Sequence, residues 1–159
     1  MFFVLENESH RKNNKKYSRQ IRIYWLLTMR EKEIVSHIVT FLKAKGYIVA
    51  TEVANLYRSA DIAVLDHEDN AWVIECKVSS IGRAITQSKI HKLSADKVFI
   101  GTTYRKTQSS TLKRVKEAGL GLFYVMPDGS ISKEVDVQID NRPWLPIRSI
   151  LIDRIRKAS

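Results

Sequence analysis

The sequence predicts an α/β domain in which a mixed central sheet is flanked by helices. An amphipathic helix comes first, because apolar residues recur at helical spacing between Arg30 and Lys45. Short apolar runs bounded by turn residues follow, as expected of strands. Helical segments then separate the later strands. Such helices act as crossovers between roughly parallel strands and cover the faces of a sheet.

The individual elements follow from local residue patterns, in the core order α-β-β-β-α-β. Gly46 ends the first helix, since glycine tolerates the left-handed conformation that follows many helices. The expected strands are apolar runs at residues 47–53, 60–66, 71–78, 96–101 and 120–126. The expected later helices lie at residues 82–93, 107–118 and 147–157. Loops or turns are expected at residues 55–59, 67–70 and 127–129, and a proline-containing linker at residues 142–146.

Length and composition limit the class of protein. With 159 residues, the chain is long enough for one domain with a hydrophobic core. It has no apolar run that could span a bilayer, and its basic cluster follows the apolar first residues, the reverse of a signal peptide. A single cysteine excludes a disulfide framework and a multi-cysteine zinc site. We therefore expect a cytoplasmic protein without a membrane partner or a small-molecule cofactor.

The charge of the chain favours a polyanionic partner. The formal net charge is +10, from 27 Lys and Arg against 17 Asp and Glu. We expect a mobile basic arm at residues 1–28, a core domain at residues 29–141 and a basic helix at residues 142–159 packed on the core. The arm is expected to bind phosphates through basic residues with no acid among them: Arg11, Lys12, Lys15, Lys16 and Arg19. For this segment, packing of residues 21–27 and a chain start at Met29 are the alternatives.

Asp61, Glu75 and Lys77 are the residues that say most about chemistry. Asp61 opens one expected strand, and Glu75 and Lys77 close the next, so a hairpin sets these ends side by side. Glu75 and Lys77 are two residues apart and face the same side of their strand, whereas Cys76 faces the other. Two carboxylates beside a lysine can hold a divalent cation and orient a water molecule.

A plain ion pair is the alternative explanation for these residues. Charged residues are common at strand ends, and Glu-x-Lys is a frequent pattern. The continuous apolar residues 72–74 just before Glu75 favour a functional site, because such a run is typical of a strand buried on both faces. A buried carboxylate and ammonium are costly without partners. A metal ion, a phosphate group or a mutual ion pair would supply one.

The order of elements, with Asp61 and the run Glu75-Cys76-Lys77 on adjacent strands, resembles the PD-(D/E)xK nuclease superfamily and its restriction-endonuclease-like fold. The resemblance spans residues 30–126. Gly46-Tyr47 ends the first helix, as in archaeal Holliday-junction resolvases and related small nucleases. Gln87 lies on the helix after Lys77, where many members carry a polar residue that faces the site.

Two residues depart from this pattern. Ala60 stands in place of the proline that names the motif, and His91 stands where one branch of the superfamily has a tyrosine. The resemblance still implies metal-dependent cleavage of nucleic acid. The expected function is therefore a DNA endonuclease, acting on branched, repair or recombination substrates. A non-catalytic DNA- or RNA-binding protein that keeps the nuclease fold is the alternative, and so is an assembly protein that uses its arm on RNA.

The resemblance also implies roles for individual residues. Asp61, Glu75 and the backbone carbonyl of Cys76 would ligate Mg²⁺, for which Mn²⁺ can substitute. Lys77 would orient or activate the attacking water, and Gln87 would steady water or phosphate. DNA would also contact basic residues of the helix that carries Gln87, namely Arg83, Lys89 and Lys92. A homodimer is expected if both strands are cut, since one such site cuts one strand.

The additional acid expected on the first helix is Glu31 or Glu33. At about 100° per residue, Glu31 falls within the arc that holds Ile34 and Ile38, whereas Glu33 falls nearly opposite. Glu31 is therefore expected to ligate the metal directly or through water. A first-turn acid that only stabilises the helix dipole is the alternative. Glu52, on the first strand, is a second candidate that could face the site or solvent.

Overall fold

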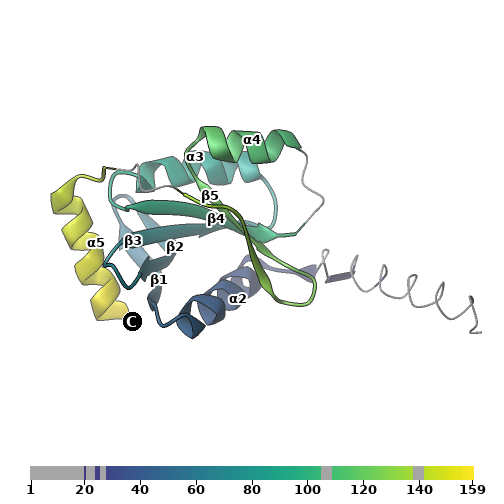
Figure 1. The fold of residues 1–159 in the computed structure, drawn as a ribbon, viewed down its shortest axis with the longest axis horizontal. Helices are drawn as coiled ribbons and strands as arrows, with labels where there is room; N and C mark the ends of the chain where they lie inside the picture. Colours follow the sequence, from purple (N-terminus) through teal and green to yellow (C-terminus); the bar gives the residue numbers. More distant parts are fainter. Residues whose placement is uncertain (1–19, 21–23, 26–27, 105–108, 138–141) are drawn as a thin grey trace, which may run out of the picture.

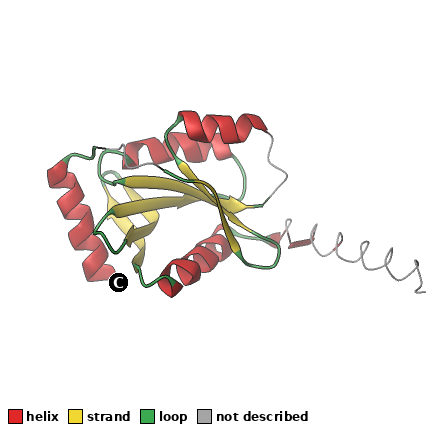
Figure 2. Ribbon diagram, in the orientation of Figure 1, coloured by secondary structure: helices red, strands yellow, loops and turns green. Residues whose placement is uncertain are grey.

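The protein is described by a computed structural model that covers residues 20, 24, 25, 28–104, 109–137 and 142–159. In this part of the chain, six strands form one mixed sheet with helices against both faces (Figures 1 and 2). The α/β class predicted from the sequence is confirmed at this level. No helix in the described ranges combines the length and the apolar character needed to cross a membrane.

The strands lie side by side in the order in which they occur along the chain. They are β1 (Ile48–Asn55), β2 (Arg58–Leu65), β3 (Ala71–Cys76), β4 (Lys97–Thr103), β5 (Gly121–Val125) and β6 (Ile131–Val135). The described helices are α2 (Glu31–Ala44), α3 (Ile81–His91), α4 (Ser109–Glu117) and α5 (Leu145–Ala158). Strands β3, β4 and β5 are parallel to one another, and the remaining neighbours pair antiparallel.

Each face of the sheet packs against its own set of helices. On one face, α2 buries Ile34, Ile38 and Leu42 completely. On the opposite face, α3, α4 and α5 close over a second apolar cluster (Figure 1). Strand β3 lies between these layers, and all of its residues are buried. A charged side chain on β3 must therefore find its partners within the protein or at a site.

The first hairpin is tighter than the sequence predicts. The expected loop at residues 55–59 is wrong, because β1 and β2 pair as far as Asn55 and Arg58, which face each other. Leu56 occupies the turn in a left-handed conformation, with φ of 56°. Two-residue hairpin turns usually carry glycine at such a position. Because glycine is absent here, the sequence did not indicate a two-residue turn. Asp61 consequently lies inside β2 and does not open it.

Strand β6 was not expected from the sequence. It pairs antiparallel with β5 at the edge of the sheet, and Val135 is its one buried residue. Edge strands carry polar side chains and lack the apolar run on which the other strand predictions depend. This strand extends the sheet beyond the predicted core order without changing the class.

The C-terminal helix packs on the sheet and begins earlier than expected. Pro146 lies in the first turn of α5, where its missing N–H breaks no helical hydrogen bond. Leu151 and Ile155 of this helix are buried in the same cluster as α3. The Arg148 Nη2 lies 2.8 Å from the Asp96 Oδ2, and Asp96 also accepts from the Ala71 amide at 2.7 Å. The ion pair ties α5 to the residue before β4, and the Ala71 hydrogen bond extends this link to the start of β3.

Gly101, on β4, allows α2 to approach the sheet closely. A Cβ at this position would lie 2.5 Å from the Ile38 Cδ1 and 3.1 Å from the Cys76 Sγ. The Gly101 carbonyl also accepts from the Lys77 backbone N–H at 2.9 Å. This glycine therefore lies where α2 and the segment after β3 meet, and those segments carry Glu31 and Lys77.

We expect Gly101→Ala to lower the free energy of unfolding by about 1–3 kcal/mol, the usual cost of overpacking a closed core. Gly82→Ala is the matched control, because a Cβ there would meet the end of the flexible Arg114 side chain, at 3.1 Å. Urea denaturation of the two variants measures the difference. Equal stability of both would contradict the close approach of α2 at Gly101.

Candidate active site

The pairing of β2 with β3 brings Asp61 and Glu75 to facing positions. Ile62 pairs with Ile74, and Asp61 and Glu75 are the next residues in this register. Facing residues of an antiparallel pair project from the same side of the sheet. The Asp61 Oδ2 also accepts from the Cys76 backbone N–H at 2.7 Å, which fixes this carboxylate at the end of β3. Both carboxylates therefore lie on the side of the sheet that α3 covers.

Lys77 follows β3 directly and joins two acids from different elements. Its Nζ lies 3.3 Å from the Glu75 Oε1 and 3.4 Å from the Glu31 Oε2. The side chain of Glu75 is 8% exposed and that of Lys77 is 17% exposed, whereas that of Glu31 is 51% exposed. The cluster thus runs from the buried end of β3 to the surface at the start of α2.

The two acids at the start of α2 have different partners. The Glu33 Oε2 accepts from the Arg30 backbone N–H at 2.6 Å and so caps the helix. Glu31 contacts Lys77, as a residue on the site side of the helix can do. The structure therefore places Glu31 in the cluster and gives Glu33 a structural contact.

Glu52 lies beside Asp61 in a strained conformation. Thr51 pairs with Ile62 and Val53 with Ala60, so Glu52 and Asp61 occupy the intervening positions on β1 and β2. Glu52 is exposed and has a φ of 52°. A residue other than glycine at such an angle stores roughly 1–3 kcal/mol of strain, and residues of this kind are concentrated at functional sites. Glu52 thus stays a candidate for the additional acid.

Gln87, on α3, links Glu75 to an arginine that the sequence analysis missed. With its amide nitrogen facing the site, Gln87 donates to the Glu75 Oε1 at 3.0 Å and accepts from the Arg58 Nη1 at 2.9 Å. The sequence analysis did not select Arg58 as a site residue, because Arg58 fell within the expected loop at residues 55–59. Its position at the start of β2, opposite Asn55, is a consequence of the tight hairpin.

His91 forms a second buried contact behind Glu75. Its Nε2 lies 3.8 Å from the Glu75 Oε2, and its side chain is completely buried. The His91 Nδ1 lies 2.8 Å from the Asn55 Nδ2, which also donates to the Ser94 Oγ at 2.8 Å. Its spacing from Gln87 was the one sequence signal for this contact, because residues four apart lie on the same side of a helix.

The three charged residues on or beside β3 titrate differently because their surroundings differ. Burial raises the pKa of Asp61, the Cys76 N–H opposes that rise, and the Glu75 carboxylate adds to it. Burial works to raise the pKa of Glu75 as well, but the His91 and Lys77 contacts outweigh it and lower that pKa. Burial opposes the charge of Lys77, yet the surrounding carboxylates, first that of Glu75, raise its pKa. Lys77 is therefore an ammonium at neutral pH.

The cluster offers two hard ligands to a cation. In the described residues, no group of three or more His, Cys, Asp or Glu side chains is arranged to hold a metal ion. Asp61 and Glu75 nonetheless share one side of the sheet, and Mg²⁺ commonly uses one or two carboxylates and keeps several waters. Burial first, and then the neighbouring Glu75 carboxylate, raise the pKa of Asp61, and a bound cation would offset both effects. The donor set fits Mg²⁺, and the Cys76 carbonyl stays a predicted ligand.

The Cys76 side chain takes no part in this cluster. It is buried on the α2 side of the sheet. Burial, with the neighbouring carboxylates, raises the pKa of the Cys76 thiol well above its usual value. The thiol is therefore neutral and inert at physiological pH.

Of the residues predicted to contact nucleic acid, the structure describes the three on and after α3. Arg83 and Lys89 are exposed on α3. Lys92 makes a structural contact, because its Nζ donates to the Ala118 carbonyl at 3.0 Å. The arm residues lie outside the described ranges: Arg11, Lys12, Lys15, Lys16 and Arg19.

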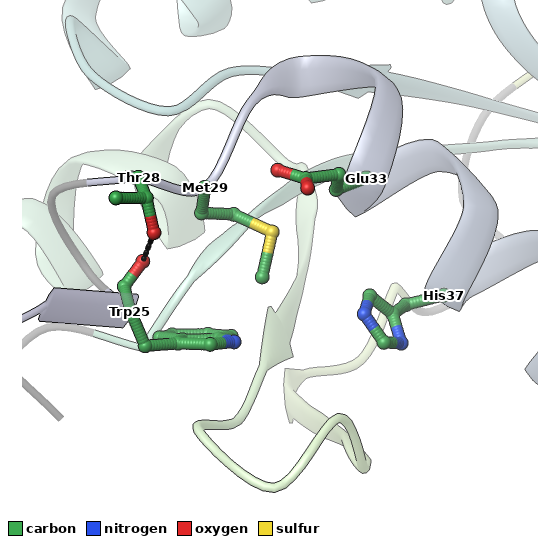
Figure 3. Close-up of a pocket in the computed structure, with 5 residues that line it drawn as sticks. All are labelled: Trp25, Thr28, Met29, Glu33 and His37. Carbon is green, nitrogen blue, oxygen red and sulfur yellow. Dashed lines mark hydrogen bonds between the residues drawn. The ribbon is translucent and has the colours of Figure 1, made fainter. Parts of the chain in front are cut away.

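A small cavity near the start of α2 is separate from the carboxylate cluster. It has a volume of about 130 Å³ and is lined by Trp25, Thr28, Met29, Glu33 and His37 (Figure 3). The Met29 side chain extends between the Trp25 indole and the His37 imidazole. Neither Asp61 nor Glu75 lines this cavity.

Comparison with known proteins shows a shared fold. No family model matches the chain. A protein of unknown function from Silicibacter pomeroyi has a similar structure, with a TM-score of 0.60 at 19% identity over 82% of this chain and 86% of that chain. Advillin from Mus musculus is 23% identical over 93 residues, or 58% of this chain. The chain spans 11% of Advillin's length. The structural likeness concerns the fold alone.

We expect Asp61→Asn to stabilise the metal-free protein at pH 7. The substitution removes a desolvated negative charge that faces Glu75, and it keeps an oxygen that can accept from Cys76. Since the pKa of Asp61 is raised on folding, protonation of the wild type favours the native state. The advantage of the variant should therefore shrink as the pH falls below that raised value. Thermal denaturation in EDTA between pH 7 and pH 4 measures this.

Asp66→Asn is the matched control for this prediction. Burial works to raise the pKa of Asp66, but hydrogen bonds from Asn70, Glu68 and Trp72 outweigh it and lower that pKa. The carboxylate of Asp66 therefore stabilises the fold above its unfolded pKa, and this contribution is lost as the pH falls through its folded pKa. At pH 7 the control should be less stable than the wild type. Destabilisation by both substitutions would contradict our account of Asp61.

Proposed function

We propose that the chain is a metal-dependent nuclease that hydrolyses phosphodiester bonds of DNA with Mg²⁺ or Mn²⁺. The observation that carries the proposal is the placement of Lys77. Its ammonium lies 3.3 Å from the buried Glu75 carboxylate, and Asp61 occupies the facing position on the neighbouring strand. The finer assignment to a restriction-endonuclease-like fold belongs to the same proposal. Its support is the order of α2, β1 to β3, α3 and β4 along the chain.

The charge balance of the cluster supports cation binding. Glu31, Asp61 and Glu75 contribute three negative charges and Lys77 contributes one positive charge, which leaves an excess of two negative charges when all four are ionised. A divalent cation is the simplest partner for such an excess at a partly buried position. Bound there, Mg²⁺ would lower the pKa of a water molecule and stabilise the charge that develops on the phosphate.

The protein's own residues would supply orientation and further electrostatic stabilisation. Asp61 and Glu75 would hold the cation, with Glu31 or Glu52 ligating directly or through water. Lys77, held as an ammonium, would donate to the attacking water or to a phosphate oxygen and would not act as a base. Gln87 would keep the Glu75 carboxylate in place, and Arg58 would offer its guanidinium to the phosphate backbone.

The net charge of the chain supports the proposed substrate class, and the single candidate site in the described part of the chain supports the proposed oligomeric state. The net charge of +10 favours a nucleic acid, and the exposed Arg83 and Lys89 lie on the helix that carries Gln87. We propose a homodimer, because one site of this kind cuts one strand. Branched substrates of repair or recombination are the proposed targets within DNA.

We expect Asp61→Asn and Glu75→Gln each to abolish Mg²⁺-dependent cleavage while the protein stays folded. Nicking of supercoiled plasmid, with EDTA as the blank, measures activity, and linear, flapped, single-stranded and four-way substrates then define the preference. Mg²⁺ should raise the melting temperature of the wild type and leave that of Asp61→Asn unchanged. Glu33→Gln is the control, since Glu33 caps α2 and should be dispensable for cleavage. Wild-type cleavage by either site variant would refute the assignment.

Lys77→Ala tests the role of the ammonium. We expect a loss of roughly 10²–10³-fold in kcat, the usual cost of removing one preorganised donor, with little change in DNA affinity. Lys133→Ala is the control, because Lys133 pairs with Asp136 on the surface, at 2.9 Å. A Lys77→Ala variant that binds DNA poorly but turns over normally at saturation would make Lys77 a binding residue. Wild-type protein that binds DNA without cleaving any substrate would favour the alternative of a non-catalytic binding protein.

Deletion of residues 1–19 tests the basic arm. The deletion removes Arg11, Lys12, Lys15, Lys16 and Arg19 and keeps Met29, which is buried against the α2 cluster. We expect weaker binding of all DNA sequences and a flatter dependence of log affinity on log salt, by about 0.9 per lost phosphate contact on duplex DNA. Cleavage at saturating DNA should persist. An unchanged salt slope would show that the arm does not contact phosphates.

A further inference from the structure

We propose that His91 is a positioning residue that orients the Glu75 carboxylate through its Nε2–H, with Asn55 and Ser94 fixing the tautomer. This inference rests on the proposed function only in that Glu75 is taken as a metal ligand. All three residues are buried, with exposed fractions of 2% for Asn55 and 0% for His91 and Ser94. They come from β1, from the end of α3 and from the loop that follows it.

The hydrogen bonds determine which nitrogen of His91 carries the proton. The Ser94 hydroxyl donates its one hydrogen to the His91 carbonyl, at 3.1 Å. The Ser94 oxygen must therefore accept from Asn55, and the group of Asn55 that faces it must be the amide nitrogen, at 2.8 Å. The second hydrogen of that nitrogen points to the His91 Nδ1, also at 2.8 Å. Nδ1 is consequently an acceptor, and the proton of the neutral ring lies on Nε2.

The protonated nitrogen faces Glu75. Among the described residues, His91 Nε2 has no hydrogen-bond partner, and the Glu75 Oε2 lies 3.8 Å from it. This distance exceeds a hydrogen bond, as is common for catalytic contacts in unliganded sites that tighten later. An unpaired buried donor is costly, and the bond from Asn55 needs only the acceptor nitrogen of the ring, so the Nε2–H on the Glu75 side points to a role toward that carboxylate.

The two oxygens of Glu75 then have separate partners. Oε1 lies 3.3 Å from Lys77 and 3.0 Å from the Gln87 amide nitrogen. Oε2 faces His91. Contacts to both oxygens fix the plane of the carboxylate, and residues of this kind behind a metal ligand typically alter metal affinity or activity by about 10–100-fold when they are replaced.

Two substitutions separate positioning from packing. His91→Leu fills the space without a donor, whereas His91→Gln offers an oxygen to Asn55 and an N–H to Glu75. We expect His91→Leu to weaken Mn²⁺ binding, measured by titration calorimetry, by about 10–100-fold. We expect His91→Gln to stay close to wild type. In metal-free thermal denaturation, His91→Leu should be less stable than wild type, because it leaves the second Asn55 amide hydrogen without an acceptor and removes a partner of the buried Glu75 carboxylate, whereas His91→Gln should keep both contacts. Equal Mn²⁺ affinity of wild type and His91→Leu, or an equal loss in both variants, would overturn the proposal.

A metal-free measurement tests the tautomer independently. In the ¹⁵N spectrum of the full chain, with His91 assigned by its loss in His91→Gln, Nδ1 should have the shift of an unprotonated nitrogen. The side-chain ¹³C shift of Glu75 should change in His91→Leu and be restored in His91→Gln. A protonated Nδ1 would overturn the proposal, and so would a side-chain ¹³C shift of Glu75 that is the same in the wild type and in both variants. If the wild type binds no Mn²⁺ but these spectra are as expected, the proposed function fails and the positioning of Glu75 by His91 stands.

Discussion

The burial of the Glu75 carboxylate is the constraint on which the rest of the site depends. The side chain is 8% exposed at the end of a strand whose residues are all buried. Burial alone would raise the pKa of Glu75, and the charge survives because Lys77, Gln87 and His91 surround it. A buried charge that loses a partner is strongly destabilising. The fold must therefore hold every one of these partners in place.

Those partners come from different elements, so the tertiary structure determines their geometry. Lys77 is held by its backbone bond to Gly101 on β4. Gln87 and His91 lie one helical turn apart on α3. The β1–β2 hairpin supplies a further contact to each of them, Arg58 to Gln87 and Asn55 to His91. A shift of α3 or of the hairpin would thus disturb the carboxylate without touching it directly.

The sequence predicted what local periodicity encodes and missed what depends on tertiary context. Helix α2 and strand β3 were evident from apolar spacing, and the two-residue spacing of Glu75 and Lys77 predicted that they share one side. The roles of Asn55 and Arg58 were not predictable. They depend on a turn at Leu56 that has a positive φ without glycine, and such a conformation is stable only in its surroundings. Strand β6 was not predicted for a different reason, because its polar residues resemble those of a loop.

The contrast between Asp61 and Glu75 argues for a site over a structural ion pair. An ion pair that served only stability would neutralise its charges, and apolar residues of similar size would often serve as well. Here the His91 and Lys77 contacts outweigh burial and lower the pKa of Glu75, whereas burial keeps the pKa of Asp61 raised. Neighbouring carboxyl groups whose pKa values are pushed in opposite directions are typical of functional sites. The fold thus tolerates an unbalanced charge at Asp61, beside the strained Glu52. Such local departures from optimal stability are expected where binding or chemistry takes place.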